Sequence, residues 1–210
     1  MPASHQKFPP MSCRSGVIDS LGPLAQKIVG RQENDAPIKK QGWLAMNTVE
    51  TKLRDRGFEI PAPAASLASF VPTLQVRDLV YISGQLPVKD GKLAVQGVVG
   101  VDLNVDDAKK GAELCLLNII GQLKAHVGSL ENVRCVRLGG FVQSESGFKE
   151  HASVVNGASD LLIYALGDRG KHVRAAVGCS SLPLGAAVEV EAIFQIIDAE
   201  SPAERLREAS

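Results

Sequence analysis

Residues 173–197 read VRAAVGCSSLPLGAAVEVEAIFQII, and this segment is the most informative part of the chain for its architecture. The spacing predicts two strands, 173–180 and 187–197, joined by a turn at 182–185. Successive residues of a strand point to opposite faces of a sheet, and both alternating sets of the second strand contain apolar side chains. Both faces of this strand are therefore expected to be partly buried. One set comprises Val188, Val190, Ala192, Phe194 and Ile196, and the other Glu189, Glu191, Ile193, Gln195 and Ile197.

Two amphipathic helices are predicted upstream of this segment. Residues 105–127 carry apolar side chains every three or four positions, with Asp106 and Asp107 in the first turn and Gly128 just after the last. Residues 148–166 repeat the apolar spacing along one side. Each helix is long enough to cover part of one face of a sheet.

Three more strands are predicted, at 79–86, 93–95 and 132–142, and a turn at 89–92 joins the first two. The Gly139-Gly140 pair in the last of them indicates a bulge or a close approach of another group. The order is β-β-α-β-α-β-β, an α+β domain with a mixed sheet and two helices packed on one face. Two helices cannot cover both faces, so the second face is expected to pack against another subunit.

The composition is that of a globular protein with one domain and an appendage. The 210 residues are 45% hydrophobic and 22% charged, with 23 basic and 23 acidic residues and 4% aromatics. Neither a basic surface nor an aromatic stacking platform for nucleic acid is indicated. No apolar stretch of about 18 residues is present, so no membrane span is predicted. The cysteines form no CxxC motif and adjoin no paired histidines, so no metal site is indicated, and a reducing compartment is the simpler assumption.

The chain divides into four segments. Residues 1–45 are an N-terminal extension whose acid-poor, mildly basic first part is typical of an organelle transit peptide or of a disordered extension. The predicted location is cytoplasmic. The alternative is a mitochondrion or another organelle, if residues 1–45 act as a transit peptide. Residues 46–63 form a short helical lead-in that Thr48 is placed to cap, 64–198 form the main domain, and 199–210 form a C-terminal tail.

Arg174 is the main candidate for a binding residue, because it is a single charge in a strand of small neutral residues. Desolvating a guanidinium without a partner costs several kcal/mol, so an anionic partner is expected. One alternative is an ion pair with Glu189 or Glu191 within the protein. The other is a fork that binds a ligand carboxylate through two parallel hydrogen bonds.

Other candidates are weaker. Glu189 and Glu191 share a strand face among apolar neighbours, which raises carboxyl pKa values and suits proton transfer, although solvent-facing glutamates on an edge strand are common. Ser83 and Gly84 end a predicted strand, where Gly84 allows close approach of a ligand or marks a bulge. His172 lies two residues before Arg174 and is either a titrating group or a surface histidine.

Several of these stretches together resemble the RidA/YjgF family of reactive intermediate/imine deaminases, also labelled L-PSP endoribonuclease. The resemblance covers about residues 70–197 and rests on 81–87 (YISGQLP), 118–130, 148–156, and Arg174 followed by Leu-Pro and Glu-x-Glu-Ala. It implies a chorismate-mutase-like fold assembled as a homotrimer, with ligand clefts between subunits and no metal or organic cofactor.

The resemblance also implies roles for individual residues. Arg174 matches the arginine that binds the carboxylate of a 2-imino or 2-enamino acid, and Glu189 matches the glutamate that holds or activates water. Ser83 and Asn156 match positions that line the cleft, next to Gly84. Phe70 stands where the best-known members have a tyrosine, and Ala176 stands where a cysteine is common, so the chain resembles a less-characterised branch.

Three functions follow from these observations. The first is hydrolytic deamination of reactive imines to 2-oxo acids and ammonia, which needs only a positioned carboxylate and a placed water. The second is a non-catalytic trimer that binds a small carboxylate metabolite, which the loss of the tyrosine hydroxyl at Phe70 favours. The third is an endoribonuclease, implied only by the family's older label and disfavoured by the neutral charge.

Overall fold

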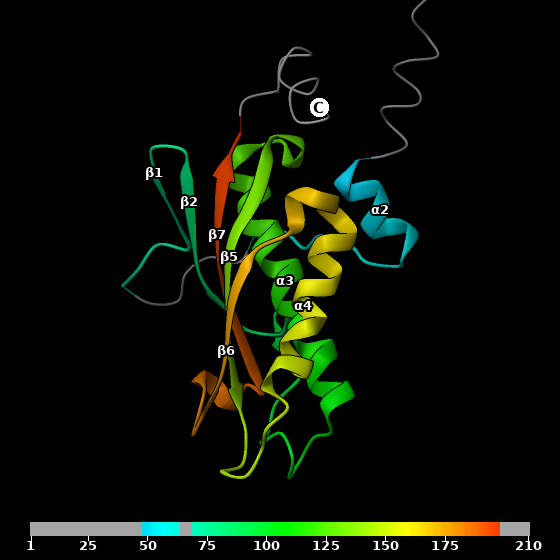
Figure 1. Cartoon of the computed structure of the whole chain (residues 1–210), viewed down its shortest axis with the longest axis vertical. Coiled ribbons are helices and arrows are strands. Elements are labelled where there is room, and N and C mark those ends of the chain that lie inside the picture. The colour runs from blue at the N-terminus through cyan, green and yellow to red at the C-terminus, as the bar shows by residue number, and fades with distance from the viewer. Residues whose placement is uncertain (1–47, 64–68, 198–210) are drawn as a thin grey trace, which may run out of the picture. The chain divides into compact units, whose positions relative to one another are not determined.

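The computed structural model describes residues 48–63 and 69–197, all of which belong to one unit of the fold. The predicted extension 1–45 and the tail 199–210 lie outside the described residues. Figure 1 shows a sheet with long helices along one side. The helices are α2 (Val49–Asp55), α3 (Val105–Val127) and α4 (His151–Leu166); the strands are β1 (Thr73–Val76), β2 (Leu79–Gln85), β3 (Val88–Lys89), β4 (Lys92–Leu93), β5 (Val133–Gln143), β6 (Val173–Cys179) and β7 (Val188–Ile196); short 3-10 turns are η1 (Leu130–Asn132), η2 (Gly167–Gly170) and η3 (Pro183–Gly185).

Five strands form one mixed sheet in the order β1-β2-β7-β5-β6. β5 and β6 are parallel, and α4 is the crossover between them, as a parallel connection requires. The pairs β1–β2, β2–β7 and β5–β7 are antiparallel. The prediction of an α+β domain with a mixed sheet and helices on one face is confirmed.

The helix α3 has the predicted bounds because both of its ends carry local signals. The Asn104 side chain accepts a hydrogen bond from the Asp107 backbone N–H at the start, and Gly128 takes a positive φ of 78° at the end. α4 begins at His151, three residues later than predicted, and its N-cap Glu150 makes no side-chain capping bond. Without a cap signal, the apolar spacing alone gave too early a start.

One face of the sheet packs on α3 and α4 and forms the core. Along β7, Val188, Val190, Ala192 and Phe194 are buried, whereas the intervening residues are only partly buried. A Cβ at Gly157 of α4 would lie 2.2 Å from the backbone oxygen of Lys109 in α3, so the helices touch through backbone at this point.

The opposite sheet face is covered by no described element and is apolar. Its exposed side chains include Leu74, Tyr81, Val173 and Val177, with Val173 67% exposed. Leu74 pairs with Tyr81 across β1 and β2, and Val177 flanks Phe141 of β5. We call this surface, with Glu189, Glu191 and Ile193 of β7, the open face.

The strand that opens the domain was partly misassigned from the sequence. β2 forms its hairpin with β1 and also pairs with β7. β1 was not predicted, because its four residues are mostly exposed and show little alternation. The predicted strand 93–95 is represented by the two residues of β4, which pair with β3 outside the main sheet. The turn at 89–92 is real, but the hairpin it closes is only two residues deep on each side.

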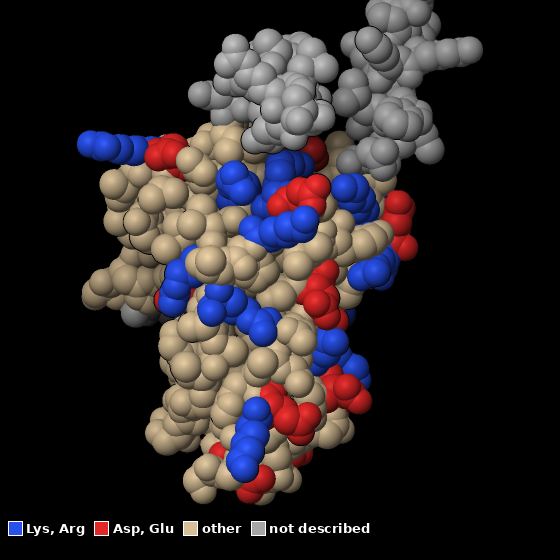
Figure 2. Space-filling model, in the orientation of Figure 1, with Lys and Arg blue, Asp and Glu red and all other residues tan. Residues whose placement is uncertain are grey.

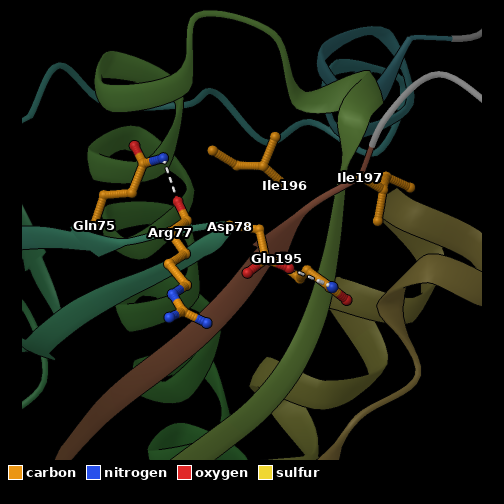
Figure 3. Close-up of a pocket in the computed structure, with 6 residues that line it drawn as sticks. All are labelled: Gln75, Arg77, Asp78, Gln195, Ile196 and Ile197. Atoms are coloured by element: carbon orange, nitrogen blue, oxygen red, sulfur yellow. Dashed lines mark hydrogen bonds between the residues drawn. The ribbon is translucent and has the colours of Figure 1, made fainter.

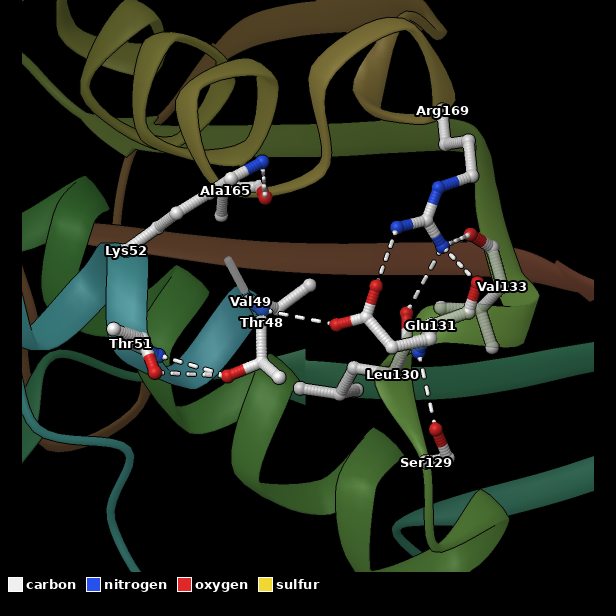
Figure 4. Close-up of polar contacts among 10 residues, drawn as sticks. All are labelled: Thr48, Val49, Thr51, Lys52, Ser129, Leu130, Glu131, Val133, Ala165 and Arg169. Carbon is white, nitrogen blue, oxygen red and sulfur yellow. Dashed lines mark hydrogen bonds and ion pairs between the residues drawn. The ribbon is translucent and has the colours of Figure 1, made fainter. Parts of the chain in front are cut away.

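The lead-in 46–63 contains the predicted helix, and Thr48 caps it. A polar cluster fixes α2 to the domain (Figure 4). The Glu131 carboxylate accepts a hydrogen bond from the Val49 backbone N–H at 3.0 Å and pairs with Arg169 at 3.2 Å. Arg169 also donates to the backbone carbonyls of Leu130, Glu131 and Val133, so one guanidinium joins η2 to the start of β5.

Candidate functional site

Arg174 lies on β6, the edge strand, and its side chain points to the helix side of the sheet. It is in register with Leu138 of β5, which is buried in the core and stands opposite Ala192 of β7. Its Nη1 donates to the Asn156 side-chain oxygen at 2.8 Å and to the Ser159 hydroxyl at 3.0 Å. Both acceptors are on α4, so the helix holds the guanidinium against the sheet edge.

The guanidinium retains two unused donors. Of its five N–H groups, two on Nη1 are taken by α4 side chains, and one on Nη2 points to the Ala152 carbonyl at 3.5 Å. The Nε–H and one Nη2–H have no acceptor among the described residues, and the nitrogens Nε and Nη2 lie on one edge of the planar guanidinium. That edge has the geometry for two parallel hydrogen bonds to a carboxylate.

The predicted alternative, an ion pair of Arg174 with Glu189 or Glu191, is not present within the described chain. Glu191 pairs instead with Arg137, Nη1 to Oε1 at 2.7 Å, on the open face. Both glutamates are on β7, which is the central strand of the sheet rather than an edge strand. The interpretation of these glutamates as edge-strand residues is therefore wrong.

Glu189 is half-buried on the open face and lies beside Gly84. A Cβ on Gly84 would be 1.8 Å from Glu189 Oε1, so the absence of a side chain at Gly84 makes room for the carboxyl. Burial raises the pKa of the Glu189 carboxyl, and the charge of Glu191 raises it further. The direction agrees with the one predicted for Glu189, and a raised pKa favours a carboxyl that exchanges a proton with water.

The sheet is irregular at Gly84, where the register of β2 against β7 shifts between Ile82 and Gln85. The interpretation of this glycine as a bulge thus holds, and the group that lies close to it is the Glu189 carboxyl, whereas the approach of a ligand stays a prediction. The Gly139-Gly140 pair shows only the close approach, because a Cβ at Gly139 would meet Glu191 and one at Gly140 would meet Val155. The bulge in β5 lies earlier, between Cys135 and Arg137.

Phe70 and Ser83 border a cavity of about 620 Å³ on the open face. Phe70 is 53% exposed, and the Ser83 hydroxyl donates to the Pro72 carbonyl at 3.3 Å. The ion pair of Arg137 and Glu191 also lines this cavity. The remaining lining residues are Val71, Leu74, Tyr81, Ile82, Ala192 and Ile193.

The predicted site residues therefore form two groups. Asn156 and Arg174 meet at the β6–α4 edge, with His172 nearby, whereas Ser83, Gly84 and Glu189 lie on the open face. One described chain does not bring the two groups together.

Sequence reasoning missed Ser159 and Arg137. Ser159 follows Asn156 by one helical turn, so the shared helix face was a usable signal once residues 151–166 were taken as a helix. Arg137 carried no comparable signal, since its partner is on a strand 54 residues away.

A second cavity, of about 430 Å³, contains none of the predicted residues (Figure 3). It lies at the β1–β2 turn and the end of β7, where Gln195 donates to the Asp78 carboxylate at 2.7 Å. Arg77 in the turn has a positive φ of 57°.

Charge and ligand types limit the chemistry of the described surface. On the face shown in Figure 2, basic and acidic side chains are interspersed rather than gathered in one basic patch. Within 48–63 and 69–197, no group of three or more His, Cys, Asp or Glu residues is arranged to hold a metal ion. No helix in this part is long and apolar enough to cross a membrane.

Burial raises the pKa of the Cys135 thiol to about 12, as expected for a cysteine that packs as a small hydrophobe.

Comparison with known proteins identifies the family of this chain. Residues 50–195 match a family described as "YjgF/chorismate mutase-like, putative endoribonuclease". The protein TCP17 of Trypanosoma cruzi is 37% identical over 155 residues, 73% of this chain and 97% of that protein. The mitochondrial protein MMF1 of Saccharomyces cerevisiae is 30% identical over 158 residues, covering 75% of this chain and 90% of that protein.

Solved structures show the same fold. A protein of unknown function from Agrobacterium tumefaciens (Atu1372) is 45% identical, with a TM-score of 0.68, and covers 72% of this chain and 94% of that one. A protein from Shewanella oneidensis, described as a "putative endoribonuclease", is 34% identical with a TM-score of 0.70, covering 71% of this chain and all of that one. The chain therefore belongs to the YjgF/RidA family.

Proposed function

We propose that this protein hydrolyses reactive 2-imino and 2-enamino acids to 2-oxo acids and ammonia. The observation that carries the proposal is the guanidinium of Arg174, which Asn156 and Ser159 hold in place while two of its N–H donors have no acceptor among the described residues. A substrate carboxylate fits those two donors. Membership of the family supports the same function.

The reaction needs few catalytic groups, because the carbon of the C=N bond is already electrophilic. Arg174 fixes the carboxylate, and Glu189 accepts a proton from a water that adds to this carbon. Glu189 returns this proton to the nitrogen, which gives a tetrahedral intermediate with a hydroxyl and an amino group on the same carbon. Glu189 then takes the hydroxyl proton and passes it to the nitrogen as the C–N bond breaks, which releases ammonia and the 2-oxo acid. A 2-enamino acid first tautomerises to the 2-imino acid. A carboxyl with a raised pKa suits both transfers.

This mechanism needs Arg174 and Glu189 in one cleft, so we propose that the chain works as a homotrimer with clefts between subunits. The exposed apolar side chains of the open face support burial against another copy. In such an assembly, Glu189, Gly84 and Ser83 of one chain face Arg174 and Asn156 of its neighbour.

Two positions bear on substrate choice. Phe70 supplies a ring without a hydroxyl at the rim of the open-face cavity. Ala176 lies two residues after Arg174 on the same side of β6 and packs against the core. The mostly apolar lining of this cavity favours imines with aliphatic side chains.

The test is turnover of imines generated in situ by an amino-acid oxidase, followed as release of the 2-oxo acid. We expect faster release of the 2-oxo acid with the protein than without it. In Arg174→Ala we expect kcat/KM to fall by about 10- to 100-fold or more, because the two parallel hydrogen bonds from the guanidinium to the carboxylate are lost. Arg54→Ala, at an exposed arginine on α2, is the matched control and should leave kcat/KM unchanged.

A non-catalytic carboxylate-binding protein is the alternative that the missing hydroxyl at Phe70 favours. It would show thermal stabilisation by 2-oxobutanoate, lost in Arg174→Ala, together with unchanged imine decay. Imine decay that the wild-type protein does not accelerate would overturn the deaminase proposal.

We further propose a cytoplasmic location, with residues 1–45 as a mitochondrial targeting segment in the alternative. The similarity to MMF1, a mitochondrial protein of yeast, supports the alternative. Fusion of residues 1–45 to a fluorescent protein decides between them, since only a targeting segment directs the fusion to mitochondria.

A further inference from the structure

The hydroxyl that holds Arg174 is itself held by a histidine. Ser159 Oγ lies 3.0 Å from Arg174 Nη1 and 3.0 Å from His172 Nε2. The other ring nitrogen of His172, Nδ1, lies 2.6 Å from the Gly170 carbonyl oxygen. The chain of contacts therefore runs from Gly170 through His172 and Ser159 to Arg174.

The direction of each hydrogen bond follows from what each atom can do. A carbonyl oxygen only accepts, so Nδ1 carries the proton and donates to Gly170. In a neutral imidazole the other nitrogen then accepts, and Ser159 must donate its O–H to His172 Nε2. That bond turns the lone pairs of Ser159 toward the Arg174 N–H.

The end of this chain of bonds is rigid. A Cβ at Gly170 would lie 2.6 Å from the Leu162 carbonyl oxygen and 2.8 Å from Ile163 Cα, so Gly170 sits directly against the backbone of α4. Ser159 is only 7% exposed. The anchor carbonyl and the hydroxyl are thus both fixed to the same helix, and little freedom remains for the histidine between them.

We propose that His172 is a positioning residue, which orients the Ser159 hydroxyl and thereby aims the guanidinium of Arg174 at the substrate carboxylate. The kinetic consequence rests on the proposed function, but the hydrogen-bond chain does not. The histidine does not touch substrate, so its effect should appear in binding of the carboxylate and not in the chemical step.

Kinetics test the consequence. His172→Phe removes both ring nitrogens, and Ser159→Ala removes the hydroxyl; each should raise KM by about 3- to 10-fold, the loss of one neutral hydrogen bond, with kcat within about two-fold of wild type. His172→Gln keeps a polar atom near Ser159 and should recover part of the KM. The double variant should be no worse than either single one, because both break the same chain. His126→Phe, at a histidine bonded to Gln75 of β1, is the control and should leave KM unchanged.

Nitrogen-15 NMR of the imidazole tests the bond chain without turnover. We expect the neutral Nδ1–H form of His172 in the wild-type protein, and a changed Nε2 signal in Ser159→Ala. An Nε2–H form would overturn the proposal, and so would an unchanged KM in His172→Phe when Arg174→Ala raises it.

If the wild-type protein turns over no imine, the Kd for 2-oxobutanoate replaces KM. An unchanged Kd in His172→Phe, with binding lost in Arg174→Ala, would then overturn the role of His172 independently of the enzyme proposal.

Discussion

Arg174 and Glu189 lie on opposite faces of the same sheet, separated by the strand β5. Arg174 shares its row with Leu138 and Ala192 on the helix side, whereas Glu189 shares its row with Phe141 and Val177 on the open face. Within one described chain the sheet therefore lies between the two side chains. If both act in the same reaction, the cleft is made by two chains.

Because Gly84 makes room for the Glu189 side chain, we expect a substitution at Gly84 to lower activity with little effect on stability. In Gly84→Ala the new methyl group would lie 1.8 Å from the carboxyl oxygen, so the flexible side chain of Glu189 must move away. We expect kcat to fall by about 10-fold or more, the scale of a misplaced proton-transfer group, with little change in melting temperature. Steady-state kinetics and thermal unfolding of the same preparation check both parts. Wild-type kcat in this variant would show that Glu189 is not placed by Gly84.

The raised pKa of Glu189 predicts a pH-dependent difference in stability. Its cause is burial and then the charge of Glu191, so the folded state prefers the protonated carboxyl. The stabilisation this group provides is complete below the ordinary glutamate pKa of about 4.3 and is lost as the pH rises through the folded value. Glu189→Gln should therefore melt higher than wild type at pH 7, and the difference should vanish near pH 4.

Glu59→Gln, at an exposed glutamate outside the sheet, serves as the control for this pH series and should melt like wild type at each pH. Melting curves at equal protein concentration from pH 4 to 8 provide the comparison. A Glu189→Gln protein that melts below wild type at pH 7 would contradict the expected direction.

The open face predicts the effect of a charge on assembly. Val177 is 46% exposed on β6 and faces away from the core, so Val177→Asp costs the folded monomer little but places a charge in an apolar contact. We expect a folded monomer without imine turnover. Analytical ultracentrifugation and circular dichroism measure the two properties. A variant that stays trimeric and active would show that the contact between chains lies elsewhere.

Arg169 is expected to be the most costly to remove among the arginines of residues 48–63 and 69–197. Arg169→Met leaves the carbonyls of Leu130, Glu131 and Val133 without their donor, which costs about 2 to 4 kcal/mol in the free energy of unfolding. Urea unfolding measures this loss. Lys171→Ala, at an exposed ion pair with Asp168, is the control and should unfold like wild type. Equal stability of the two variants would mean that Arg169 does not anchor this corner.

Elements with local signals were predictable from the sequence. α3 carries its own cap at Asn104 and its own stop at Gly128, so its bounds follow from nearby residues. β7 shows strict alternation because one face packs on α3 and the other lies on the open face. β1 has neither signal, since it is short, lies at the sheet edge and is defined only by pairing with β2.

The candidate site was only partly predictable, for a similar reason. Arg174 stood out as a charge in a neutral strand, but its partners come from α4 and depend on how that helix packs against β6. The ion pair between Arg137 and Glu191 depends on the register of β5 and β7. Residue patterns name candidates well, whereas contacts between distant elements follow from the fold.

Mixing two impaired variants tests the two-chain cleft most directly. Arg174→Ala and Glu189→Gln are each expected to lose most of the activity, and a trimer that contains both keeps one cleft in which Arg174 and Glu189 are intact. Random co-assembly of equal amounts restores about a quarter of the wild-type clefts, because three in four trimers are mixed and each has one intact cleft in three. Recovery of imine turnover to about that fraction is the predicted result. A co-assembled mixture no more active than its two components would contradict a cleft built by two chains.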